Sequence, residues 1–328
     1  MPAERDLALL PKAHLHLHME GGMRPQTLAE LAEKYGIEVP VIRGFGSFPA
    51  FADMYVAACE VIKAEDDLRR LVDETLDDAV AAGAVYVEPS FFIPHHNERL
   101  GPDEYVLEMA LDALAAASKR TGVAAAFMLA GDRTRPPEAA VEQARIAARY
   151  AGRGVAAFGL ANDEAPWPPE PFEEAFRIAR EAGLLCTPHA GELAGPESVR
   201  GALDKLGANR IQHGVRAMED PALVERLAVE QVCLDVCPTS NLLLSVVPDL
   251  ESHPLQALLA AGVRCSINAD DPLLFGPGLL EEYTLCRTDL GLSDAQLATC
   301  ARSSLLSSGA AESVKRQGLA DIDGWLTA

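Results

Sequence analysis

Short apolar segments recur eight times along the chain, and a stretch with a helical pattern follows each of them. Between the apolar segments lie amphipathic stretches such as DDLRRLVDETLDDAVAAGA and DPALVERLAVE, and several of them end near a Gly, as helices often do. Strands alternating with helices indicate a parallel sheet, so eight such units predict an α/β fold closed into a (β/α)8 TIM barrel. The predicted strands are residues 13–19, 85–92, 123–130, 155–161, 184–190, 210–214, 232–238 and 263–269.

The connection between the first two predicted strands, residues 20–84, is far longer than one helix requires. It contains an aromatic-rich stretch, PVIRGFGSFPAFADMYVAA. We expect a helical flap inserted over the site, mixed with helices that pack on the barrel wall. Phe45 and Phe48 are the aromatic residues expected to face the pocket. The chain from about Ser293 onward reads as extra amphipathic helices that close the barrel, so residues 1–328 are predicted to form a single domain.

Composition narrows the function classes. The chain has 328 residues, 49% of them apolar, and a net charge of −21. It lacks the lysine- or arginine-rich runs that hold phosphates, which argues against nucleic acid as a partner. The seven cysteines include no CxxC pair and fit a reducing cytoplasm. The N-terminal sequence lacks a signal-peptide pattern, and no apolar window approaches the length of a membrane span.

Four candidate metal ligands lie where predicted strands end. His16 and His18 belong to the first strand, His189 to the fifth, and Asp270 follows the eighth. The chemistry of α/β barrels is located at this end of the strands. Alternation along a strand puts His16 and His18 on one face, so both imidazoles can reach one ion. Three imidazoles and one carboxylate form a tetrahedral zinc set, which indicates a metal-assisted hydrolase.

One zinc ion per chain is expected rather than two. Two-metal barrel hydrolases commonly bridge their ions with a modified lysine on the fourth strand, and here no lysine occurs between Lys119 and Lys205. Iron, cobalt and manganese are alternatives for the same ligand set. His14 lies on the same strand face one layer deeper, so we expect it to be structural rather than a fifth ligand.

Three further ionisable residues can move protons. A zinc ion lowers the pKa of bound water from about 15.7 to about 7, and His213, at the end of the sixth strand, is the candidate to hold that water and take its proton. Glu192 is the candidate proton donor, because a carboxyl group beside an apolar wall can stay protonated near neutral pH. Asp271 could accept a hydrogen bond from substrate or water, and could also cap the helix that follows it.

With these residues in place, the chain resembles the adenosine/adenine deaminase family of zinc-dependent amidohydrolase barrels. The resemblance spans nearly the whole length and rests on PKAHLHLHMEG, HAGE, RIQHGVRAMED, CPTSN, HPLQALLAAGV and NADDPLLFG, in that order. It implies zinc on the four ligands named above and protonation of purine N1 by Glu192. It further implies that His213 orients and deprotonates the water that attacks C6, while Asp271 contacts N7 and the hydroxide. The products would be a 6-oxopurine and ammonia.

Several positions bear on the substrate. Glu20 stands at the end of the first strand, where adenosine-specific members of the family resemble HLDG and the Asp of that motif reaches the 5′-hydroxyl. Base-specific members more often have Glu at this position. Asn162 stands where adenosine deaminases have a Gly whose N–H meets N3. The small residues of PHAGE let the backbone approach a ligand, so Gly191 joins Phe48, Glu20, Asn162 and Asp271 as an expected substrate contact.

The expected substrate is therefore a small-molecule purine, with adenosine or 2′-deoxyadenosine first, giving inosine. Free adenine, giving hypoxanthine, and a 5′-modified adenosine such as aminodeoxyfutalosine are the alternatives. Arg24, His95 and His96 could serve a carboxylate on such a 5′ group, although we expect all three to be solvated. A barrel hydrolase that cleaves an amide ring or a phosphoester and a catalytically silent binding protein are the other function classes.

Overall fold

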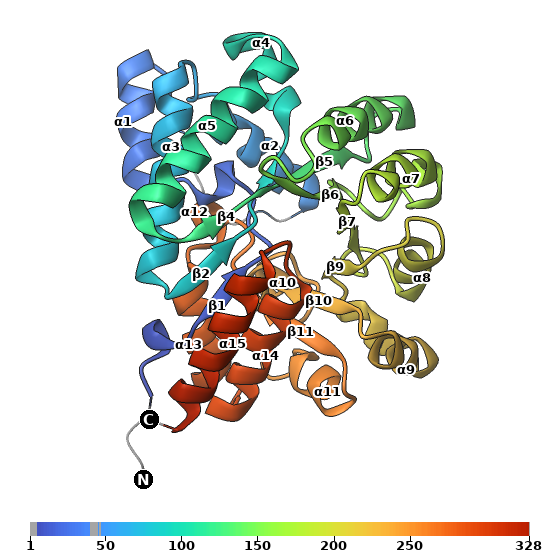
Figure 1. The fold of residues 1–328 in the computed structure, drawn as a ribbon. Helices are drawn as coiled ribbons and strands as arrows, with labels where there is room; N and C mark the ends of the chain where they lie inside the picture. The colour runs from blue at the N-terminus through green and yellow to red at the C-terminus, as the bar shows by residue number, and fades with distance from the viewer. Residues whose placement is uncertain (1–4, 40–44, 46, 328) are drawn as a thin grey trace.

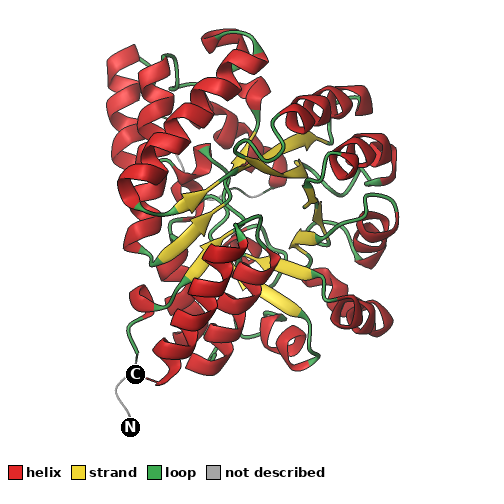
Figure 2. Cartoon of the chain, viewed as in Figure 1, coloured by secondary structure: helices red, strands yellow, loops and turns green. Residues whose placement is uncertain are grey.

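A computed structural model describes residues 5–39, 45 and 47–327 of the chain. Short parallel strands form a ring, and helices surround this ring on the outside (Figure 1). Figure 2 shows the strands in yellow around the centre of the barrel and the helices in red outside them. The structure confirms the predicted (β/α)8 barrel.

Each of the eight predicted strands corresponds to one position in the barrel wall, and three of them are split in two by a local irregularity. In chain order the wall consists of β1 (Lys12–His14), β2 with β3 (Ala84–Val87 and Ser90–Phe91), β4 with β5 (Ala124–Ala125 and Phe127–Asp132), β6 (Val155–Ala161), β7 with β8 (Leu185–Cys186 and His189–Ala190), β9 (Arg210–His213), β10 (Cys233–Val236) and β11 (Arg264–Ile267).

The strands pair in parallel in the order β1-β2-β4, β3-β5-β6-β7 and β8-β9-β10-β11. Two backbone hydrogen bonds close the ring between the last strand position and the first: His18 N donates to the Asp270 carbonyl at 3.0 Å, and Asp270 N donates to the His16 carbonyl at 3.0 Å. This closure brings residues that are more than 250 positions apart in the sequence to one point of the wall.

The helices begin and end on the residues that local chemistry favours. Asp220 caps α9 by accepting hydrogen bonds from Ala222 N and Leu223 N. Gly122, with φ +79°, ends α5 in the left-handed conformation that glycine adopts without strain. The helices are α1 (Pro25–Tyr35), α2 (Phe48–Cys59), α3 (Glu65–Ala81), α4 (Asn97–Leu100), α5 (Asp103–Thr121), α6 (Pro137–Arg149), α7 (Glu173–Glu181), α8 (Pro196–Asp204), α9 (Pro221–Glu230), α10 (Pro238–Leu243), α11 (Leu255–Ala260), α12 (Pro272–Phe275), α13 (Leu279–Thr288), α14 (Asp294–Ser307) and α15 (Glu312–Thr327). Short 3-10 turns add η1 (Leu7–Leu9), η2 (Glu20–Gly22), η3 (Ile93–His95), η4 (Glu170–Phe172) and η5 (Val215–Glu219).

The long connection between β1 and β2 holds three helices with different positions. Helix α3 packs beside α5 on the outside of the barrel, whereas α2 lies against η2 at the end of the barrel where the strands terminate. Phe45 is buried, and its ring contacts those of Phe51 and Phe275. The expectation that Phe45 faces the pocket is therefore wrong, because this ring belongs to an aromatic core under the insertion.

The C-terminal helices cover the closure of the barrel. Helix α14 packs on both β11 and β1, and α15 packs on α14 (Figure 1). Trp325 of α15 donates from Nε1 to the carbonyl of Asp6 at 2.8 Å, which ties the two ends of the described chain together. No helix among the described residues is both long and apolar enough to cross a membrane.

Candidate active site

Four side chains converge at the C-terminal end of the strands: His16, His18, His189 and Asp270. Asp270 Oδ1 lies 3.2 Å from His16 Nε2 and 3.3 Å from His18 Nε2. The Nε2 atoms of His16 and His189 are 3.2 Å apart. The structure thus brings together all four residues that the sequence predicts as metal ligands.

Hydrogen bonds on the far side of two imidazoles determine where their protons lie. His16 Nδ1 is 3.1 Å from the carbonyl oxygen of Asp235, and His189 Nδ1 is 3.0 Å from that of Leu160. A carbonyl oxygen can only accept, so both rings carry their proton on Nδ1 and present a lone pair at Nε2. Such outer bonds are the usual support of metal-binding histidines.

Two facing lone pairs at 3.2 Å repel each other unless a cation lies between them. A tetrahedral zinc ion with bonds of about 2.0–2.1 Å places its ligand nitrogens roughly 3.3–3.4 Å apart, which matches the spacing found here. Burial, and then the neighbouring imidazoles His16 and His18, hold the pKa of His189 well below its ordinary value and keep that ring neutral. The donor set, its spacing and its protonation fit a zinc ion.

Glu192 and His213 stand directly beside this cluster. Glu192 Oε1 is 3.4 Å from His213 Nε2, and His213 Nε2 is 3.7 Å from Asp270 Oδ2. Burial raises the pKa of Glu192 well above the ordinary carboxyl value, and the negative charge of Asp270 adds to the rise. This direction of shift favours the protonated carboxyl group, the form that a proton donor needs.

A chain of hydrogen bonds that sequence reasoning missed holds His213. Leu255 N donates to His253 Nδ1 at 3.2 Å, His253 Nε2 lies 3.2 Å from Asn241 Oδ1, and Asn241 Nδ2 lies 3.1 Å from His213 Nδ1. Because a backbone N–H can only donate, the direction of every bond in the chain is fixed. Neutral His213 therefore accepts at Nδ1 and carries its proton on Nε2.

Asp271 is buried, and its Oδ1 has no hydrogen-bond partner among the described residues. Its side chain does not cap α12, which begins immediately after it. Burial, and then the charge of Asp270, raise the pKa of Asp271 well above the ordinary value. Gly21 makes room for this carboxylate, since a Cβ on Gly21 would lie 1.8 Å from Asp271 Oδ1.

A cavity of about 100 Å³ opens over these groups. Phe48 and Asn162, two of the expected substrate contacts, line it together with Asp271. The Asn162 side chain is held by Asp132, whose Oδ1 accepts from Asn162 Nδ2 at 3.1 Å. Cavity-lining residues that the sequence did not single out include Phe51, Tyr55, Ser90, Phe92, Asp132 and Leu244.

Two of the expected substrate contacts lie outside the lining of this cavity. Glu20 is fully buried, with Oε1 2.5 Å from His96 Nε2 and Oε2 2.5 Å from Tyr55 Oη. Burial alone would raise the pKa of Glu20, but these partners outweigh it and lower the pKa to about 2. Gly191 donates its N–H to Glu164 Oε1 at 2.6 Å. Internal partners already take up the polar groups of both residues, and direct contact with substrate stays a prediction for both.

The three residues considered as partners of a 5′ substituent lie in different places. Arg24 pairs with Asp78 at the surface, and His96 is fully buried against Glu20, so His96 is not the solvated residue that we expected. Only His95 lines the cavity. His14 is buried beneath the cluster, where Ala269 N donates to its Nε2 at 3.3 Å, and burial lowers its pKa to about 3.

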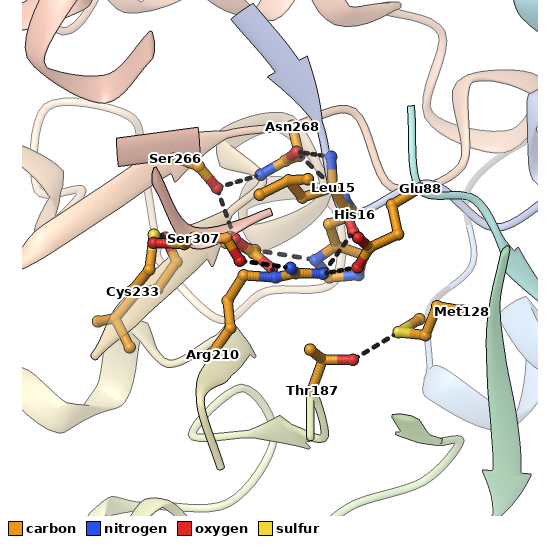
Figure 3. Close-up of polar contacts among 12 residues, drawn as sticks. Leu15, His16, Glu88, Met128, Thr187, Arg210, Cys233, Ser266, Asn268 and Ser307 are labelled. Carbon is orange, nitrogen blue, oxygen red and sulfur yellow. Dashed lines mark hydrogen bonds and ion pairs between the residues drawn. The ribbon is translucent and has the colours of Figure 1, made fainter. Parts of the chain in front are cut away.

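A buried ionic layer lies next to His16, one of the four clustered residues (Figure 3). Arg210 pairs with Glu88 through Nη2 and Oε1 at 2.6 Å and with Asp235 through Nε and Oδ2. Ser266 Oγ donates to Asp235 Oδ1 at 2.6 Å, and Asn268 Oδ1 accepts from the backbone N–H of His16 at 3.1 Å. The layer therefore supports His16 from below, through the carbonyl of Asp235 and the amide of Asn268.

Comparisons with known proteins agree with this geometry. Residues 11–325 match the family model described as adenosine deaminase. A provisionally named adenosine/adenine deaminase of Streptomyces virginiae is 45% identical over 342 residues, covering 100% of both chains. The crystal structure of an adenine deaminase from Arthrobacter aurescens is 34% identical, with a TM-score of 0.91 over 97% of this chain and 99% of that one. A zinc-bound amidohydrolase from Burkholderia ambifaria is 26% identical, with a TM-score of 0.89 over 98% and 93% of the two chains.

The match of the family model to nearly the whole chain, and the high identity to a full-length relative, leave one assignment. The chain belongs to the adenosine deaminase family.

Proposed function

We propose that the protein catalyses hydrolytic deamination of a 6-aminopurine with one zinc ion held by His16, His18, His189 and Asp270. Water adds to C6 of the purine, and the amino group leaves as ammonia, so the product is a 6-oxopurine. The observation that carries this proposal is the position of Glu192: its carboxyl group, whose pKa burial raises, stands beside the four clustered residues and lines the same cavity. A zinc ion at this cluster would lower the pKa of a bound water from about 15.7 to about 7.

The residues around the cluster divide the remaining work. Glu192 gives its proton to purine N1, which makes C6 more electrophilic. His213 orients the attacking water through Nε2, and Asp271, with a free Oδ1, accepts a hydrogen bond from the water or the purine. To take the proton of the water at Nε2, neutral His213 would need the opposite tautomer, which reverses two hydrogen bonds and breaks the one from Leu255 N, so we assign it the orienting part of the expected role.

Within the 6-aminopurines, the cavity favours a compact and uncharged substrate. Its volume of about 100 Å³ lies below the roughly 300–1,000 Å³ typical of sites for drug-sized ligands. Among the described residues that line it, none is a Lys or an Arg, whereas Asp132, Glu192, Asp270 and Asp271 are acidic. These features favour free adenine over adenosine and disfavour a substrate with an anionic 5′ group.

The test compares kcat/KM for adenine, adenosine and a 5′-carboxylated adenosine on one zinc-loaded preparation, followed by product chromatography and ammonia release. We expect hypoxanthine and ammonia from adenine, a lower kcat/KM with adenosine, and the lowest value with the carboxylated nucleoside. A preference for adenosine would move the proposal to the nucleoside. Failure to deaminate any 6-aminopurine with zinc bound would overturn it.

A further inference from the structure

Glu164 is a buried carboxylate that the proposed reaction does not use. It lies in the loop after β6, two residues beyond Asn162, and only 2% of its surface is exposed. It does not line the cavity. A buried charge in such a position needs partners, and here all of the partners come from one segment.

The two carboxylate oxygens of Glu164 accept hydrogen bonds from four consecutive backbone N–H groups. Gly191 N donates to Oε1 at 2.6 Å, and the N atoms of Glu192, Leu193 and Ala194 donate to Oε2 at 2.9, 2.8 and 3.0 Å. A carboxylate offers about four lone-pair sites, so residues 191–194 satisfy its full capacity.

The segment can wrap around the anion because of its first residue. Gly191 has φ +69°, and a Cβ at this position would lie 2.4 Å from Val199 Cγ2. Successive N–H groups that converge on one anion form a backbone nest. The usual nest holds a ligand, whereas this one holds a side chain of the protein itself.

The nest carries the proton donor. The side chain of Glu192 starts from the second residue of the segment and reaches within 3.4 Å of His213 Nε2. Two arginines fix the carbonyl groups on either side: Arg133 Nη2 donates to the His189 carbonyl at 2.5 Å, and Arg216 Nη1 donates to the Leu193 carbonyl at 2.9 Å.

We propose that Glu164 is a positioning residue for the proton donor: it fixes the backbone of residues 191–194 so that the Glu192 carboxyl group faces the metal-binding cluster at the distance that proton transfer to the purine requires. The proposal rests on the proposed function, because it assigns Glu192 the donor role. Glu164 itself touches neither the substrate cavity nor the metal ligands' side chains in the described contacts.

The test is Glu164→Gln. This variant keeps the shape of the side chain but has only one acceptor oxygen, and its NH2 group faces backbone N–H donors of residues 191–194. We expect zinc content and KM to stay near the wild-type values while kcat falls about 10²-fold, the cost of a misplacement near 1 Å. Amide exchange of residues 191–194, followed by mass spectrometry, should accelerate about tenfold, as expected when hydrogen bonds to a charged group are lost.

Glu173→Gln is the matched control, because Glu173 is an exposed glutamate on the neighbouring helix α7. It should leave kcat, the pH profile and the exchange of residues 191–194 unchanged. Wild-type kcat together with wild-type exchange in Glu164→Gln would overturn the proposal. A kcat loss without faster exchange of residues 191–194 would also overturn it, since the loss would then not act through the backbone that carries Glu192.

Glu164→Asp keeps the charge and all acceptor sites but is one methylene shorter, and it carries the test if Glu164→Gln does not fold. We expect an intermediate loss of kcat, about tenfold; wild-type kcat would contradict the proposal. Amide exchange in residues 191–194 is measured without substrate, so it tests this inference independently of the proposed function. Failure of the proposed function would appear instead as absent deamination by the wild-type protein.

Discussion

The two walls of the cavity are built in different ways. On one wall, the metal-ligand cluster and its neighbours stand at the ends of β1, β8, β9 and β11, and hydrogen bonds to other strands or to a fixed relay hold their rings. On the other wall, Phe48 and Tyr55 come from the inserted helix α2 and His95 from a short turn. The Phe48 ring contacts Phe51, and the Tyr55 ring contacts both His95 and His18, the latter on the first wall. The comparison suggests that the strand-end wall determines the chemistry and the inserted wall determines which purine enters.

The largest effect should follow from removing a ligand on the strand-end wall. His18→Ala leaves three donors, so we expect zinc to be lost and turnover to fall to the uncatalysed background. Metal analysis of the purified protein and ammonia release measure the two quantities. A variant that retains one zinc per chain and wild-type turnover would show that the cluster is not the metal site.

The next effect separates metal binding from proton donation on the same wall. Glu192→Gln keeps the shape of the side chain but removes the proton, so kcat should fall about 10²–10⁴-fold, the usual contribution of general acid catalysis. Zinc content should not change, because Glu192 is not one of the four ligands. A variant with zinc bound and kcat unchanged would remove Glu192 from the mechanism.

The pH dependence of kcat tests the same residue in the wild-type protein. Burial and the charge of Asp270 raise the pKa of Glu192, and in the proposed mechanism the protonated form is the active one. Turnover should therefore persist above the ordinary carboxyl range and decline only as pH rises through the raised pKa. In Glu192→Gln the residual activity should lack this decline; if it keeps the wild-type alkaline limb, another group is responsible for that limb.

The difference between the walls also explains how much could be read from the sequence. The eight strands were predicted correctly, because apolar runs at strand length are separated by helical stretches throughout, and barrel closure then places every strand end at one face. The positions of His16, His189, Glu192 and Asp270 follow from that placement alone. Glu20 could not be placed in this way, since the partners that bury it, Tyr55 and His96, lie in segments whose packing no local pattern encodes.

The buried acids and bases beneath the site form an intermediate case. Arg210, Asp235 and Glu88 each lie on or directly beside a predicted apolar strand, and charges in such positions must pair inside the barrel. The sequence therefore indicated that these charged residues form ion pairs inside the barrel, but it did not indicate which residues pair with each other. Glu164 gave no local signal, because its four partners are backbone groups of a segment that begins 27 residues later.

The smallest effect should come from the inserted wall. Tyr55→Phe removes one of the two partners of the buried Glu20 carboxylate, so the free energy of unfolding should fall by about 1–3 kcal/mol. The preference for adenine over adenosine should shift by less than about tenfold, or 1.4 kcal/mol, while kcat for adenine stays close to wild type. Tyr105→Phe, at an exposed tyrosine that also contacts a glutamate, is the matched control. A kcat loss as large as that of Glu192→Gln would erase the distinction between the two walls.

The central claim is that a water molecule, activated at the four-ligand cluster and assisted by Glu192, replaces the amino group of a purine. Incubation of the zinc-loaded protein with adenine in ¹⁸O-labelled water, followed by mass spectrometry of the purine product, tests it most directly. The account predicts hypoxanthine with a single ¹⁸O atom at C6 and one ammonia released for each hypoxanthine formed. Unchanged adenine, or a product that carries no ¹⁸O, would contradict it.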